Sequence, residues 1–120
     1  MLANSDIALV TGTWSRVEVS GALVRAARAG RGDEPGLLAL LDADLGEDGP
    51  VTVVGATQRD VEADALRLVR RHVIRAMDAW HLATAVLTLP RLAEAGEERG
   101  FASRDETQAS VATLLGLRLL

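Results

Sequence analysis

Short apolar runs alternate along the chain with longer segments in which hydrophobic residues recur at helical spacing. Apolar runs of four residues separated by turn signals are typical of buried strands, whereas amphipathic periods of ten residues or more favour helices. Strands are therefore predicted at residues 7–10, 51–54, 100–103 and 117–120. Helices are predicted at residues 14–29, 34–45, 57–72, 77–89 and 105–115.

Residues typical of helix ends occur at most of these boundaries. Thr13 stands at the N-cap position of the first predicted helix, and Thr57 with Asp60 three residues later resembles a capping box. Pro90 is expected to end the helix over residues 77–89, and Gly116 to cap the one over residues 105–115. The helix over residues 77–89 is apolar on nearly every side, so we expect it to be the most buried one.

Strands that alternate with helices predict an α/β protein, with a parallel sheet covered by helices on both faces. Functional sites in such folds lie at the carboxyl ends of the strands. The length of 120 residues fits one domain spanning residues 1–120.

The amino-acid composition excludes several kinds of functional site. The chain has no cysteine and no lysine, and arginine supplies all 13 of its basic residues against 17 acidic ones. Disulfides, zinc-thiolate sites, thiolate nucleophiles and Schiff-base or P-loop lysine chemistry are therefore excluded. No apolar run approaches the ~18 residues of a membrane span, and the first residues lack the basic start of a signal peptide, so we expect a cytoplasmic protein without membrane contact.

Three acidic residues stand at or near predicted helix starts, each just after a strand or loop: Glu18, Asp78 and Asp105. A carboxylate in the first turn of a helix is favoured by the helix dipole and by capping, and this explains many such residues taken singly. Several carboxylates that converge would repel one another, so a hard divalent cation is their natural partner.

The blocks around these acids resemble the PIN domain family, specifically the VapC-type toxin ribonucleases. The resembling segments are residues 9–19, which end in Arg16-Val17-Glu18-Val19, residues 78–83 (Asp78-Ala79-Trp80-His81-Leu82-Ala83) and residues 101–105 (Phe101-Ala102-Ser103-Arg104-Asp105). The resemblance implies a three-layer α/β/α fold and a Mg²⁺- or Mn²⁺-dependent endoribonuclease, the toxin of a bacterial toxin-antitoxin system. It also implies a small antitoxin protein as partner.

On this resemblance, Glu18, Asp78 and Asp105 are the catalytic and metal-binding carboxylates. Ser103 is either a hydroxyl that orients a carboxylate or a cap of the following helix. His81 is expected to hydrogen-bond within its helix rather than bind metal, and Trp80 to be a core or interface residue. The arginines that flank the acidic positions are the candidates for RNA phosphate contacts, with a solvated surface as the alternative: Arg16, Arg28, Arg75 and Arg104.

The sequence departs from the family pattern at its start. Family members begin with a strand that carries the first catalytic aspartate, followed by a helix, and nothing here precedes the segment that matches the second strand. We therefore expect either an N-terminally incomplete ribonuclease or a catalytically impaired PIN-like scaffold that binds an antitoxin or dimerises. Absence of that strand would expose backbone groups of its neighbours, so self-association is expected, with a homodimer as the simplest form.

Overall fold

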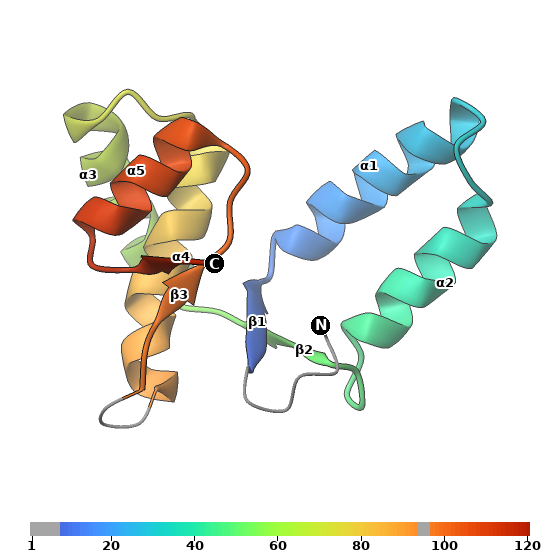
Figure 1. The fold of residues 1–120 in the computed structure, drawn as a ribbon, viewed down its shortest axis with the longest axis horizontal. Helices are drawn as coiled ribbons and strands as arrows, with labels where there is room; N and C mark the ends of the chain where they lie inside the picture. Colours follow the sequence, from blue (N-terminus) through green and yellow to red (C-terminus); the bar gives the residue numbers. More distant parts are fainter. Residues whose placement is uncertain (1–7, 94–96) are drawn as a thin grey trace. The chain divides into compact units, whose positions relative to one another are not determined.

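The computed structural model describes residues 8–93 and 97–120, which form five helices and four short strands (Figure 1). These residues fall into two compact units, Met1–Val54 and Gly55–Leu120. Strand pairing is parallel in both units, so the predicted mixed α/β class is confirmed. Ile7, the first residue of the first predicted strand, lies outside the described residues.

The first unit is a strand-helix-helix-strand segment. Strand β1 (Leu9–Gly12) pairs in parallel with β2 (Val51–Val54), with Leu9 opposite Val51. Between them in sequence come helices α1 (Ser15–Arg28) and α2 (Glu34–Asp44), which contact each other (Figure 1). The strand over residues 51–54 has the predicted bounds, and both helices lie within one residue of theirs.

The start of α1 differs from the prediction. The N-cap position is occupied by Trp14, whose backbone is already helical and whose side chain makes no capping hydrogen bond, so Thr13 as N-cap was wrong. The reason is that β1 continues to Gly12, two residues beyond the predicted end, and moves the helix start along the chain. Hydroxyls hold this junction in another way, because the side chains of Thr11 and Ser15 are hydrogen-bonded to each other.

The second unit contains three helices and a second parallel strand pair. Helices α3 (Gln58–Arg71) and α4 (Ala76–Leu92) pack along each other, and α5 (Glu106–Leu114) contacts α4. Strand β3 (Gly100–Phe101) pairs in parallel with β4 (Arg118–Leu119). Each of the two sheets in the described residues has two strands.

The hydrophobic core of the described residues lies in the second unit and centres on α4. Leu82 and Ala83 are completely buried, and α4 contributes more buried residues than any other described helix, which confirms that prediction. Small residues along α4 allow its neighbours to approach closely. The rest of this core comes from α3, α5 and the segment before β4: Val61, Ala65, Leu68, Val111, Ala112 and Leu117.

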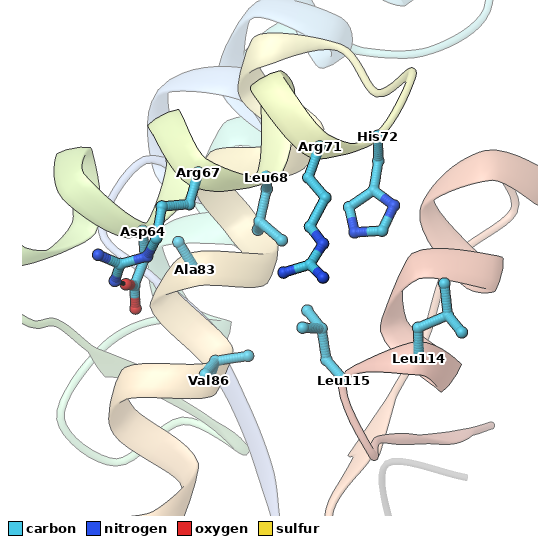
Figure 2. Close-up of a pocket in the computed structure, with 9 residues that line it drawn as sticks. All are labelled: Asp64, Arg67, Leu68, Arg71, His72, Ala83, Val86, Leu114 and Leu115. Atoms are coloured by element: carbon cyan, nitrogen blue, oxygen red, sulfur yellow. Dashed lines mark ion pairs between the residues drawn. The ribbon is translucent and has the colours of Figure 1, made fainter.

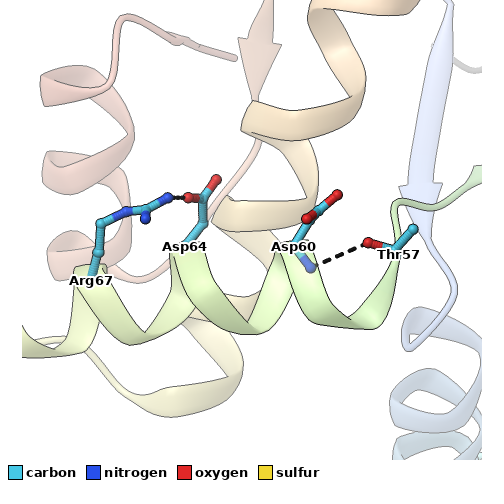
Figure 3. A network of polar contacts seen from close by, with 4 residues as sticks. All are labelled: Thr57, Asp60, Asp64 and Arg67. Atoms are coloured by element: carbon cyan, nitrogen blue, oxygen red, sulfur yellow. Dashed lines mark hydrogen bonds and ion pairs between the residues drawn. The ribbon is translucent and has the colours of Figure 1, made fainter.

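Helix α3 begins with the predicted cap. The Thr57 hydroxyl accepts a hydrogen bond from the Asp60 amide at 3.2 Å, and this satisfies one of the amides that the first turn leaves without an intrahelical partner (Figure 3). One turn further along, Asp64 and Arg67 form an ion pair on the helix surface. The sequence signal at Thr57 therefore located this helix start correctly.

Pro90 does not end α4, contrary to the prediction. The helix continues to Leu92, and the amide of Ala93 still donates to the Leu89 carbonyl at 2.9 Å. Pro90 removes the one backbone donor that would bond to the Val86 carbonyl, but its fixed φ of about −65° is compatible with a helix, so the chain can continue in helical conformation. At the end of α5, Gly116 has a φ of +87°, the left-handed conformation predicted for a glycine cap.

None of the helices in the described ranges has the length and apolar composition that crossing a membrane requires.

Candidate functional site

Asp78 is the third residue of α4 and is half-buried. The first-turn position explains part of its occurrence, because the amide end of a helix attracts negative charge. Within the described residues its carboxylate makes no hydrogen bond and no ion pair. A half-buried carboxylate without such partners is able to accept a ligand.

Asp105 is the N-cap residue of α5. One carboxylate oxygen, Oδ1, accepts a hydrogen bond from the Gln108 amide at 2.8 Å. The other oxygen has no hydrogen bond from any part of the chain that the structure describes. Asp105 therefore caps a helix and keeps one oxygen available for a cation or a water molecule.

Gln108 connects the starts of α4 and α5. Its side-chain Nε2 donates to the Asp78 carbonyl at 3.1 Å, and its Oε1 accepts from the Ser103 hydroxyl at 2.5 Å. The side chain is 8% exposed, so it is a buried polar group with both of its ends satisfied. Through Gln108, the loop that carries Ser103 and Asp105 is attached to the first turn of α4.

Ser103 also organises the turn before α5. Its hydroxyl oxygen accepts a hydrogen bond from the Asp105 amide at 3.1 Å. This local bond is of the kind that serine makes with the backbone two residues on, and it holds the N-cap residue in place. The structure thus brings Ser103, Asp105 and the backbone of Asp78 into one hydrogen-bond network.

Glu18 belongs to the first unit. It is the fourth residue of α1 and is exposed, and its amide donates to the Trp14 carbonyl at 3.1 Å. Its position after β1 is the one expected from the sequence. Asp78 and Asp105 belong to the other compact unit, Gly55–Leu120.

The four candidate RNA-binding arginines are all exposed: Arg16, Arg28, Arg75 and Arg104. Arg28 pairs with Glu34 at 3.8 Å, an exposed contact of small energetic value. Arg75 is the N-cap residue of α4, and Arg104 lies between Ser103 and Asp105. The latter two therefore lie in sequence beside the two carboxylates of the second unit.

Two further residues of the segment over residues 78–83, Trp80 and His81, are partly buried. Trp80 is partly buried and packs against the core cluster, in agreement with a core role. His81 is half-buried on the same helix.

Asp78 and Asp105 are the two candidate metal-binding carboxylates of the second unit. Mg²⁺ is commonly bound by only one or two carboxylates, with water and substrate phosphate completing its six oxygen ligands. Asp78 and one oxygen of Asp105 offer that number of ligands in the second unit. No group of three or more acidic or histidine side chains arranged to hold a metal occurs within residues 8–93 and 97–120.

Sequence reasoning missed Gln108. Glutamine in the first turn of a helix is unremarkable, and its function here depends on the packing of α5 beside α4, which local sequence does not encode. A weak signal existed, because Asp105 followed by Gln108 has the spacing of a capping box.

No protein-family model, no curated protein and no solved structure matches this chain.

Proposed function

We propose that this chain is a PIN-like, Mg²⁺- or Mn²⁺-dependent ribonuclease, the toxin component of a bacterial toxin-antitoxin pair. The proposal starts from the resemblance of three sequence blocks, and one structural observation supports it. Gln108 ties the first turn of α4, which carries Asp78, to the N-cap of α5, which carries Asp105. The backbone carbonyl of Asp78 and the carboxylate of Asp105, from distant parts of the sequence, thereby belong to one hydrogen-bond network.

The chemistry follows from these groups. A bound divalent cation would polarise a phosphoryl oxygen and make water a better nucleophile, so that no covalent enzyme intermediate is needed. Asp78 and Asp105 would hold the cation, and Glu18 would be the third carboxylate, as the resemblance implies. Ser103 and Gln108 would fix the position of Asp105, because the Ser103 hydroxyl accepts from its amide and the Gln108 amide donates to its carboxylate.

Arginine side chains supply the means of binding RNA. Arg75 and Arg104 are exposed and adjoin the candidate carboxylates in sequence, so they would contact phosphates next to the scissile bond. Arg16 would do the same beside Glu18, and Arg28 would contact RNA only after its pair with Glu34 opens. In this proposal the protein acts in the cytoplasm, as part of a three-layer PIN-like fold.

A second candidate is a PIN-like scaffold that binds an antitoxin or a second copy. The observation that favours it is the exposure of large apolar side chains in the second unit, where Val73 is 96% exposed and Leu114 71%. Exposed apolar surface of this kind is commonly covered in a complex. The two candidates are distinguished by metal binding, since the scaffold needs none.

The test exploits two matched pairs of aspartates. Asp60 occupies the same third position in α3 that Asp78 occupies in α4, and Asp33 caps α2 by accepting from the Gly36 amide at 2.9 Å, as Asp105 caps α5. Asparagine keeps the shape and the capping oxygen of aspartate but removes its charge. Replacement by asparagine therefore removes the negative charge that attracts a metal ion while preserving the helix start.

Mn²⁺ binding is measured by calorimetry, and RNA cleavage is measured with a substrate that carries a fluorophore and a quencher. Asp78→Asn and Asp105→Asn should each weaken Mn²⁺ binding about tenfold and slow cleavage about 100-fold. Asp60→Asn and Asp33→Asn should leave both unchanged. Equal effects of all four substitutions would refute the site assignment. Absence of Mn²⁺ binding by the unsubstituted chain, with an antitoxin or a second copy still bound, would favour the scaffold.

A further inference from the structure

A groove of about 530 Å³ opens on the second unit between α3, α4 and the C-terminal end of α5 (Figure 2). We call it the α3–α5 groove. Its walls are mainly aliphatic, with Leu68, Val86, Leu114 and Leu115 around it, and its polar side is formed by the end of α3. It shares no residue with the candidate metal site.

The charge of the groove is unbalanced. Arg67 lines it, but its guanidinium is paired with Asp64. Arg71 also lines it and, among the described residues, makes no ion pair. Figure 2 shows the Arg71 guanidinium pointing between the apolar side chains, with the His72 ring beside it. Within residues 8–93 and 97–120, the lining of the groove therefore presents one positive charge without an ion pair, next to a hydrocarbon surface.

The apolar surface is exposed to water. Leu114 is 71% exposed and Leu115 37%, and both side chains line the groove. A ligand that covers them would remove hydrocarbon surface from water, and a carboxylate on that ligand would form a bidentate pair with the Arg71 guanidinium.

We propose that the α3–α5 groove binds a monocarboxylate with an aliphatic chain, such as a medium-chain fatty acid. The volume lies within the ~300–1,000 Å³ of typical small-molecule sites. A nucleic acid is disfavoured because it requires several phosphate contacts, whereas the described lining residues offer one guanidinium without an ion pair, that of Arg71, among apolar walls. The proposal is independent of ribonuclease activity, because none of these residues is assigned to that site.

The experiment uses sodium decanoate, below its micellar concentration, with the full chain. Binding is followed by calorimetry and by amide chemical shifts. Decanoate should bind saturably at one site. Acetate, which has the carboxylate without the chain, and decyltrimethylammonium, which has the chain with the opposite charge, should each bind at least tenfold more weakly.

Neighbouring arginines provide the matched control. Arg70 and Arg71 both lie in the last turn of α3, where a cation interacts favourably with the helix carbonyls, but only Arg71 lines the groove. Arg71→Gln should weaken decanoate binding at least tenfold, and Arg70→Gln should leave it unchanged. Leu114→Ser, at an exposed position that a folded chain tolerates, should also weaken binding severalfold.

Several results would overturn the proposal. Equal loss of affinity in the two arginine variants would show a non-specific charge effect, and equal binding of decanoate and decyltrimethylammonium would show simple hydrophobic adsorption. Saturable binding of an acidic amphipathic peptide, with no binding of decanoate, would assign the groove to a protein partner instead.

Discussion

Replacement of Gln108 by alanine should destabilise the second unit while leaving its helices intact. The substitution removes the side-chain bonds to the Asp78 carbonyl and to the Ser103 hydroxyl. The hydrogen bond from the backbone amide of residue 108 to the Asp105 carboxylate remains possible, so the cap of α5 is preserved. The experiment therefore isolates the connection between α4 and the loop before α5.

The size of the effect can be estimated from the contacts. Each of the two lost hydrogen bonds costs about 1 kcal/mol, and the space left by the buried Gln108 side chain adds roughly 1 kcal/mol more. Alanine returns about 0.4 kcal/mol through its higher helix propensity. The free energy of unfolding should fall by about 2–3 kcal/mol in total.

Urea unfolding monitored by tryptophan fluorescence measures this change, since Trp80 packs against the core of the same unit. Gln58→Ala is the matched control, because Gln58 is an exposed first residue of α3 whose side chain makes no hydrogen bond within the described ranges. It should change stability by less than about 0.5 kcal/mol. A loss below about 0.5 kcal/mol for Gln108→Ala would refute the structural role assigned to this glutamine.

Two further predictions concern stability and use the same urea measurement. Leu82→Ala empties a completely buried position and should cost about 2–5 kcal/mol, whereas Leu66→Ala, at a position 44% exposed, should cost much less; similar losses would place the core elsewhere. Gly116→Ala should cost about 1 kcal/mol, because the φ of +87° at this position is strained for alanine. Gly21→Ala, inside α1, should be neutral or stabilising, because the added Cβ would lie 3.3 Å from Nη1 at the flexible end of the Arg25 side chain. A stabilising Gly116→Ala would contradict the left-handed conformation.

The aspartate at position 105 illustrates how a residue can satisfy two explanations. As an N-cap its side chain uses only one carboxylate oxygen, so capping leaves the other oxygen for another purpose. Stability alone does not separate the explanations, because Asp105→Asn is expected to preserve the cap. Only a charge-sensitive measurement, such as Mn²⁺ affinity, tests the second role.

Much of the secondary structure could be predicted because it depends on neighbours in sequence. The cap at Thr57, the glycine end at Gly116 and the β-branched run of β2 are local signals, and the structure contains all three. The failures were local competitions between signals. Thr13 is not the N-cap of α1, because β1 continues to Gly12. Pro90 does not end α4, which continues to Leu92.

The sequence by itself determined the α/β class, the parallel pairing and the candidate acids, because hydrophobic period and residue type are properties of short segments. Tertiary structure decided which of these groups share a network. Gln108 bonds to the backbone of Asp78, thirty residues away in the sequence, and to Asp105. Arg71 lines the same groove as Leu114 and Leu115 only because α3 and α5 both border it. Such contacts depend on how helices pack against each other, and packing is set by the whole core rather than by any one segment.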